Sequence, residues 1–292
     1  MEKYKRISAR LFGNLAEKLG SHLESLEKSL GKSDMGILFR TYVSMMISTS
    51  LFVFLGFFAG SVVFLNVILN ETLMYSLITG FGVGLLSTSF AFLMSYYYPI
   101  QRMKSRAKSI KNNLPFAINH MSAIASSKVP PYIIFKLLAE FEEYGQVSRE
   151  AQKIVRDVNV FGHDMNTALK QAVERTPSQE LQEFLGGLVS VEETGGNLVD
   201  FLRVQADEAM FDYRQKRKRY LETLSTYADF YTAVLVAAPL FLVAVLTIMS
   251  MVGGEVLGMD IKDAMTLGIY GVIPLMNTAF IGFIHLTQPE VI

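Results

Sequence analysis

The sequence contains no cysteine, so disulfide bonds, covalent haem attachment and thiolate metal sites are excluded. The histidines show no paired spacing typical of a metal site, and no H-E-x-x-H motif occurs. We therefore predict that the protein binds no metal ion and no cofactor, and that each histidine is structural. The four histidines are His22, His120, His163 and His285.

Motifs of nucleotide-dependent and hydrolytic enzymes are also missing. Neither a Walker A lysine motif nor a G-x-S-x-G nucleophile motif occurs in the 292 residues. Gly80, Gly82 and Gly84 superficially resemble a phosphate loop, but they lie in an uncharged apolar stretch, so close helix packing or a local kink is the preferred interpretation. We predict that the chain is not an enzyme, has no catalytic residue, and depends on another protein for any ATP-driven work.

Charge is absent from four long apolar stretches, which lie between residues 40 and 71, 71 and 102, 229 and 255, and 263 and 290. A helix needs about 20 apolar residues to cross ~30 Å of hydrocarbon, so each stretch is long enough to span a membrane. Gly56 and Gly60 form a small-xxx-small pair in the first stretch, which is typical of helix contacts but also common in membrane helices. The sequence therefore predicts an integral membrane protein with four transmembrane helices.

Basic residues are distributed unevenly between the connecting segments. Residues 1–40 hold eight Lys and Arg and residues 102–229 hold eighteen, whereas the turn around Glu71 holds none and the turn from 255 to 263 only Lys262. Because Lys and Arg mark the cytoplasmic side, we place both termini and the middle segment in the cytoplasm of a multi-pass protein of the cell membrane. The first 40 residues lack the apolar stretch of a cleavable signal peptide.

The same pattern divides the chain into four predicted parts. Residues 1–40 form an amphipathic N-terminal helix region, 41–101 a first transmembrane hairpin, 102–229 a cytoplasmic helical bundle, and 230–292 a second transmembrane hairpin. No strand pattern occurs in the middle part. The predicted fold class is therefore all-α, with a cytoplasmic six-helix bundle inserted between spans two and three.

Helix start and stop signals follow one another in the middle segment. We predict helix starts at Asn113, which precedes Leu114 and Pro115, at Ser148, at Asp164, and at a capping box over residues 176–179. Gly162 ends one predicted helix. Gly195 and Gly196 end another, and Asn197 with Asp200 starts a last helix that has no Gly or Pro before Pro239 and so runs into the third span. The predicted turn residues are Gly162, Gly195, Gly196 and Asn197.

Charges are sorted along the middle segment. Residues 102–139 contain seven Lys and Arg and no acid, whereas residues 140–208 contain six Lys and Arg against fourteen Asp and Glu. The basic ends adjoin spans, so we expect them to lie against anionic headgroups, each cation contributing about 1 kcal/mol. Nucleic-acid binding is disfavoured because stacking aromatics are not interleaved with the cations. The membrane-proximal basic collar before span three consists of Arg214, Lys216, Arg217, Lys218 and Arg219.

The order of these signals resembles the type II secretion F domain, which is found in the inner-membrane platform proteins of type II secretion systems, type IV pili, Tad pili and the archaeal flagellum. The resemblance begins at Leu114-Pro115 and continues through Met121-Ser122 and Val129-Pro130. It then includes Ile154, Asp157, Val158, Gly162, Met165, Ala168 and Leu169, and it ends with Glu193, Thr194, Gly195, Gly196, Asn197, Leu198 and Leu202. Two positions depart from the family pattern. Glu192 stands where a Gly is usual, and Ser126, Ser127 and Lys128 replace an Ala-Gly pair.

The resemblance implies a non-enzymatic scaffold that binds a hexameric secretion ATPase and passes its movement to pilin-like subunits. Longer relatives carry two copies of the domain, so a second copy is expected from a homodimer or a paralogue. Because the acidic middle is expected farthest from the membrane, the predicted ATPase-facing residues are Asp157, Asp164, Glu192 and Glu193; each is alternatively a helix cap or an ordinary solvated acid.

Two other function classes remain open from sequence. One is a membrane-anchored signalling or regulatory protein with a cytoplasmic helical relay domain, which the short exported loops disfavour. The other is an oligomeric channel or carrier, which lacks the mid-span charges typical of such proteins.

Overall fold

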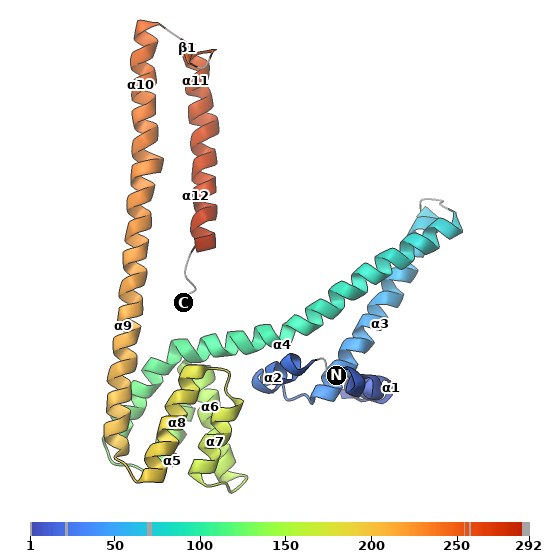
Figure 1. Cartoon of the computed structure of the whole chain (residues 1–292), viewed down its shortest axis with the longest axis vertical. Coiled ribbons are helices and arrows are strands. Elements are labelled where there is room, and N and C mark those ends of the chain that lie inside the picture. The colour runs from blue at the N-terminus through green and yellow to red at the C-terminus, as the bar shows by residue number, and fades with distance from the viewer. Residues whose placement is uncertain (1, 21–22, 69–71, 254, 257, 288–292) are drawn as a thin grey trace. The chain divides into compact units, whose positions relative to one another are not determined.

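The computed structural model describes residues 2–20, 23–68, 72–253, 255–256 and 258–287. The chain divides into two compact units, Met1–Asp207 and Glu208–Ile292 (Figure 1). Within the described ranges the fold is almost entirely helical, and the strands are limited to a two-residue pair, so the predicted all-α class is confirmed. The grouping of six helices in one cytoplasmic bundle and the four-part domain division stay predictions.

The first unit contains two N-terminal helices, a long hairpin and a set of shorter helices. Its elements are α1 (Glu2–Gly20), α2 (Glu24–Lys32), α3 (Phe39–Val63), the π-helical turn η1 (Phe64–Ile68), α4 (Leu73–Ala125), α5 (Pro131–Glu140), the 3₁₀ turn η2 (Glu142–Tyr144), α6 (Gln146–Asn159), α7 (Met165–Arg175), α8 (Gln179–Thr194) and the first part of α9 (Leu198–Tyr231).

The second unit continues α9 and adds a second helical hairpin. Its further elements are the π-helical turn η3 (Thr232–Ala237), α10 (Ala238–Val252), the antiparallel pair β1 (Glu255–Val256) and β2 (Met259–Asp260), α11 (Ile261–Leu267), the π-helical turn η4 (Gly268–Val272) and α12 (Ile273–Thr287).

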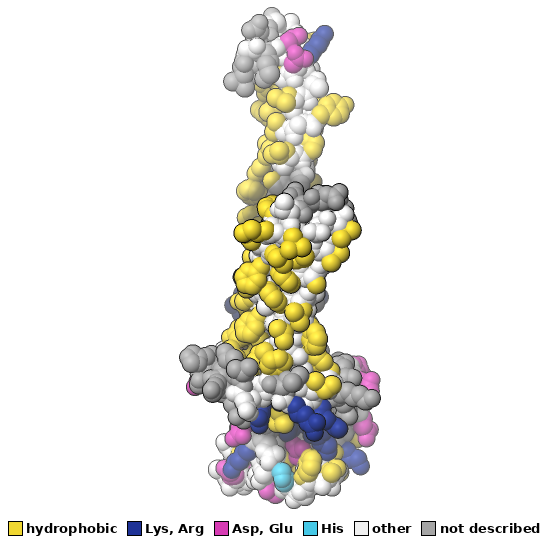
Figure 2. Space-filling model, turned by 90° about the vertical axis from the view of Figure 1, so that its right-hand side faces the viewer, with side chains coloured by type: hydrophobic (Ala, Val, Ile, Leu, Met, Phe, Trp, Pro, Cys, Tyr) yellow, Lys and Arg dark blue, Asp and Glu magenta, His cyan; other side chains and the backbone are white. Residues whose placement is uncertain are grey.

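Four helical stretches are long and apolar enough to cross a membrane, as the charge-free stretches predicted: Phe39–Val67, Leu73–Ala125, Leu198–Met251 and Ile261–Leu286. Most side chains of their apolar parts are exposed, as expected for helices that contact lipid. Figure 2, which faces the α3–α4 hairpin, shows hydrophobic side chains along it, and Lys and Arg side chains gather below that apolar stretch. The chain is therefore a multi-pass membrane protein.

Glycines allow α3 and α4 to pack closely in the first hairpin. A Cβ on Gly80 would lie 2.8 Å from Val62 Cγ2, and a Cβ on Gly84 would lie 3.0 Å from the Phe54 ring. The glycine-rich segment thus serves helix packing, which agrees with the interpretation preferred from sequence. Gly56 and Gly60 instead meet no atom within 4 Å, so they face away from the α3–α4 contact.

The N-terminal helices pack against the base of this hairpin. Leu26 and Leu30 of α2 are buried with Val43 and Met46 of α3. Ile7 of α1 is exposed, whereas Ala16 of the same helix is buried. His22 lies outside the described residues.

Helix α4 corrects one predicted helix start. The sequence suggested that a new helix begins at Asn113, but α4 continues through Pro115 to Ala125. Asn113 Nδ2 donates a hydrogen bond to the carbonyl of Ser109 at 2.9 Å, so this side chain bonds back into the helix rather than capping a new one. Leu114 and Ile118 are buried on the continuing apolar face. We infer that this burial, worth about 1.5–3 kcal/mol per large side chain, offsets the ~3 kcal/mol cost of an internal proline.

Two further helices begin at residues other than those predicted from the sequence. Ser148 lies inside α6, which begins at Gln146, and its hydroxyl donates to the carbonyls of Leu138 and Phe141 in the preceding turn. The predicted capping box at Thr176 is also wrong: α8 begins at Gln179, and Ser178 is its N-cap, accepting from Leu181 N at 3.3 Å. In α8 a neighbouring hydroxyl replaces the predicted cap, whereas α6 begins after Gly145 without a side-chain cap.

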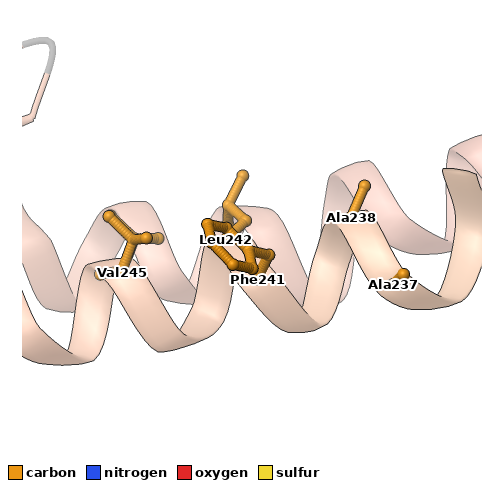
Figure 3. A pocket seen from close by; sticks show the side chains of 6 residues that line it. Ala237, Ala238, Phe241, Leu242 and Val245 are labelled. Atoms are coloured by element: carbon orange, nitrogen blue, oxygen red, sulfur yellow. The ribbon is translucent and has the colours of Figure 1, made fainter. Parts of the chain in front are cut away.

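Aromatic contacts join α9 and α12 in the second unit. Phe280 of α12 lies 6.2 Å from Phe230 and 5.4 Å from Tyr231 of α9, measured between ring centroids. A depression of about 540 Å³ over α10 is lined by Ala, Phe, Leu and Val side chains, and none of them is polar (Figure 3). We interpret this depression as lipid-facing surface, because it offers a ligand no hydrogen-bonding side chain.

Candidate partner-binding surface

The turn between α6 and α7 presents an apolar tip to solvent. Val160 and Phe161 are exposed, Phe161 at 60%. The turn is fixed by Gly162, whose φ of +71° is left-handed and favours glycine, and by the His163 N–H, which donates to the Asp157 carbonyl at 3.2 Å. Arg156 lies over the Phe161 ring at 5.8 Å from its centroid. The geometry therefore holds an aromatic side chain on the surface directly before Asp164.

Asp164 is the N-cap of α7, as the sequence indicated. Its carboxylate accepts from Thr167 N at 3.0 Å and from Thr167 Oγ1 at 2.6 Å. These hydrogen bonds lower the pKa of Asp164 below its usual 3.8, so the group is ionised at neutral pH. The side chain is also exposed, so Asp164 both caps a helix and presents negative charge.

Glu193 lies on the same polar surface. Its carboxylate forms an ion pair with Lys170 Nζ at 2.6 Å, with both side chains at least half exposed. The hydrogen bond and charge of Glu193 raise the pKa of Lys170, and the charge of Asp164 adds to that shift. Asp164, Lys170 and Glu193 are therefore close enough to interact, and the half-buried Glu192 is adjacent. We call Asp164, Lys170, Glu192 and Glu193, with the tip residues Val160 and Phe161, the α7–α8 surface.

Asp157 was expected in the same set, and the structure corrects this expectation. Asp157 is only 3% exposed, and its carboxylate is bound by Arg175 Nη1 at 2.5 Å. It faces the interior between α6 and α7 rather than a partner. Spacing on the helix could have indicated this, because Asp157 lies three residues after the buried Ile154 on the apolar face of α6.

The turn between α8 and α9 uses its two glycines differently. Gly195 has a φ of +65° and ends α8 in the left-handed conformation, whereas Gly196 does not adopt a positive φ. The N–H of Gly196 donates to the Val191 carbonyl at 2.9 Å. Asn197 Oδ1 then accepts from Val199 N at 3.0 Å and starts α9. The backbone requirement for glycine, which the sequence assigned to both positions, falls on Gly195 alone.

Sequence reasoning missed a buried ionic network around Glu150. This carboxylate is 2% exposed and accepts from Arg106 Nη2, from Lys153 Nζ at 3.2 Å and from Arg175 Nε at 3.2 Å. Charged groups are buried at low cost only when paired, and here three cations surround one carboxylate. The signal was present in α6, where Glu150 shares the apolar face with Val147, Ala151 and Ile154.

The network also connects to the chain before the first span. Arg106 Nη1 donates to the carbonyl of Lys32 at 2.7 Å, and Lys153 forms an ion pair with Asp34 at 2.6 Å. Burial alone would raise the pKa of Asp34, but the hydrogen bond and charge of Lys153, with the charges of Arg106 and Arg102, lower it overall. The residues after α2 are therefore attached electrostatically to α4 and α6.

The predicted basic collar lies on α9 in the second unit. Its five cationic side chains are all exposed, and the lysine at 218 lies 3.9 Å from the Glu222 carboxylate. Exposed cations next to an apolar span are typical of side chains that lie at lipid headgroups.

Residues 117–246 match the family described as "Type II secretion system (T2SS), protein F". Residues 117–246 are thus similar to the protein F family of the type II secretion system. The resemblance inferred from the sequence is thereby confirmed, and the matched residues run from α4 to α10 and include the whole α7–α8 surface.

Curated relatives come from methanogenic archaea. An uncharacterized protein of Methanocaldococcus jannaschii is 26% identical over 201 residues, covering 68% of this chain and 34% of the relative. The flagella accessory protein J of the same organism is 27% identical over 146 residues, covering 50% of this chain and 26% of the relative. The flagella accessory protein J of Methanococcus voltae is 24% identical over 145 residues, covering 49% and 26%.

The chain thus spans about a third or less of the length of these relatives. No solved structure matches the chain significantly.

Proposed function

We propose that this chain is a membrane platform subunit of a type IV filament or type II secretion-like machine, which couples a cytoplasmic secretion ATPase to the assembly of pilin-like subunits. The match of residues 117–246 to the protein F family carries the proposal, and the relatives named flagella accessory protein J support it. Four apolar helices, two on each side of the shorter helices α5–α8, provide the membrane part. In this role the chain is a scaffold and does no chemistry itself.

A deletion strain tests the general role. We expect loss of surface filaments or of secretion, while the amount of pilin-like protein in the membrane stays unchanged. Complementation with the wild-type gene is expected to restore assembly. Normal filaments and normal secretion in the deletion strain would rule the proposal out.

We place the ATPase contact on the α7–α8 surface. Glu193 is exposed, Glu192 is half-buried next to it, and the exposed ring of Phe161 precedes Asp164 on the same surface. A basic partner surface fits these acids, and an apolar pocket fits the tip. Asp157 is left out of this contact because it is buried against Arg175.

Charge reversal tests this placement. Glu192→Lys with Glu193→Lys is expected to weaken capture of the ATPase more at low salt than at high salt, because exposed charges are screened beyond ~10 Å at 0.1 M ionic strength. Glu174→Lys with Glu183→Lys is the matched control, since both acids are exposed in the same helices α7 and α8. Equal capture by the Glu192/Glu193 variant and wild type at low salt contradicts the placement.

We further propose that both termini and the segment containing α5–α8 are cytoplasmic. Since the chain has no cysteine, single introduced cysteines are unique labels for a membrane-impermeant maleimide. Asp260→Cys, at the exposed turn before α11, is expected to react in intact cells, and Ser126→Cys, after α4, only after lysis. Labelling of Ser126→Cys in intact cells and of Asp260→Cys only after lysis would show the opposite topology and contradict this proposal.

Relatives carry sequence beyond the region matched here, and we propose that a second F domain reaches the assembly through a homodimer or a paralogue. Co-purification of two differently tagged copies of this chain from the native membrane distinguishes these alternatives.

A further inference from the structure

A second surface, formed by α4 and the corner between α5 and α6, is built from aromatic rings. The Phe141 ring contacts the His120 ring edge-on at 4.5 Å between centroids, and Tyr144 lies 6.2 Å from Phe141. His120 Nδ1 and Tyr144 Oη are 3.1 Å apart, within hydrogen-bonding distance. Phe116 precedes His120 by one helical turn on α4 and so lies on the same face.

These rings remain accessible although their positions are fixed. Phe141 is 37% exposed and Phe116 is 39% exposed. The carbonyl of Phe141 accepts from the buried Ser148 hydroxyl, which holds the backbone at the corner. A fixed aromatic ring loses little conformational entropy when it binds a partner, so such rings make effective anchors.

Acids outnumber cations at the corner itself. Glu140, Glu142 and Glu143 are exposed there, and residues 137–148 and 112–127 contain no Lys or Arg, although Lys128, Lys136 and Arg149 flank these ranges in the sequence. Burial raises the pKa of Tyr144, and the charge of Glu143 adds to the shift, which shows that this carboxylate lies close to the aromatic cluster. The nearest cation before residue 112, Lys111, forms an ion pair with Glu180 at 3.4 Å.

We propose that this aromatic–acidic surface, formed by Phe116, His120, Phe141, Tyr144, Glu142 and Glu143, binds an arginine-bearing segment of a partner protein. A guanidinium can stack on an aromatic face and donate to carboxylates at the same time, and it is more weakly hydrated than an ammonium group. An acidic or purely apolar segment would leave these carboxylates without a counter-charge. The surface lies on α4 and η2 and shares no residue with the α7–α8 surface, so the proposal does not depend on the ATPase contact.

Peptide binding to the full-length protein tests the proposal. The protein is placed in nanodiscs of neutral phosphatidylcholine, and fluorescent hexa-arginine is titrated at low salt, with hexa-lysine as the comparison. We expect hexa-arginine to bind more tightly than hexa-lysine. Glu142→Gln with Glu143→Gln is expected to weaken hexa-arginine binding roughly fivefold or more. Phe141→Leu, which keeps an apolar side chain but removes the ring, is expected to weaken it about two- to fivefold and to abolish the preference for arginine.

Controls separate this surface from general attraction between opposite charges. Glu174→Gln with Glu183→Gln removes the same number of exposed acids elsewhere and is expected to change the affinity less than twofold. Hydrogen exchange of the wild-type protein, which needs no variant to fold, is expected to show protection at residues 137–146 on addition of hexa-arginine. Equal weakening by the control pair, an unchanged affinity of Phe141→Leu, or absence of protection at residues 137–146 would each overturn the proposal.

Discussion

Substitution of Glu150 is expected to have a large effect on folding. Its carboxylate is 2% exposed and accepts from Arg106, Lys153 and Arg175. In Glu150→Gln the side-chain shape is kept, but the negative charge is lost and an NH₂ group replaces one acceptor. Arg106, itself 5% exposed, would then lose its counter-charge and keep neutral acceptors, which include the Lys32 carbonyl and the Gln146 amide oxygen.

The magnitude follows from the cost of leaving a buried charge without its counter-charge. Removing one partner of a buried ion pair typically costs about 3–5 kcal/mol, and we expect about 3 kcal/mol here because Gln retains one acceptor. That is more than a hundredfold change in the folding equilibrium. Arg106→Met is expected to cost less, because Glu150 then keeps Lys153 and Arg175. We therefore also expect Glu150→Gln to lower the free energy of unfolding more than Arg106→Met does.

Pulse proteolysis in urea, on protein in detergent micelles, measures these differences. Glu174→Gln, an exposed acid on α7, is the matched control and is expected to stay within ±0.5 kcal/mol of wild type. A loss below about 1 kcal/mol for Glu150→Gln, or a larger loss for Arg106→Met, would refute the reasoning that Glu150 is the centre of the network.

Three further predictions concern turns and pH. Gly195→Ala is expected to destabilise the first unit by about 1 kcal/mol, because Gly195 has a φ of +65°. Gly186→Ala is expected to stabilise the unit by about 0.5–1 kcal/mol, because Gly186 lies within α8 and an added Cβ would meet no atom within 4 Å. The urea midpoints of unfolding of the two variants and wild type measure both effects. Lys128→Gly is expected to stabilise by up to about 1 kcal/mol, since Lys128 has a φ of +56°, and an unchanged midpoint would contradict this. The pKa of Asp34 is lowered in the folded state, so its contribution to folding stability is present above pH 3.8 and is lost as the pH falls through the folded-state pKa. The difference in unfolding free energy between wild type and Asp34→Asn is therefore expected to become smaller in acid. A difference that does not change with pH would contradict the ion pair with Lys153.

The sequence predicted features that depend on local pattern. Four charge-free stretches indicated four spans, because a membrane helix requires a continuous apolar surface, and Asp164 indicated the start of α7 because its carboxylate can satisfy the first N–H groups. Gly195 and Asn197 were likewise predicted from local pattern, as the end of α8 and the start of α9. The spans depend on one continuous stretch of the sequence, and the helix ends depend on residues within four positions of one another.

Features that depend on contacts between distant elements were missed. Asp157 was expected on the surface because acids are usually solvated, yet Arg175 binds it from another helix. Asn113 and Pro115 were expected to start a helix, yet burial of Leu114 and Ile118 continues α4 through them. The aromatic cluster was missed as well, since His120 and Tyr144 are 24 residues apart and no local spacing relates them.

The correction at Pro115 changes how the first unit can respond to a bound partner. Had a helix begun at Asn113, a turn would have separated the second span from the helices that follow. Instead α4 carries the second span, the buried Arg106 and the core residues Ile118 and Met121 in one helix. Arg106 in turn contacts Glu150 of α6 and the end of α2, so elements from before the first span and after the second share one ion network. A force applied at α6 can therefore reach the second span through the Arg106–Glu150 contact and the continuous helix α4.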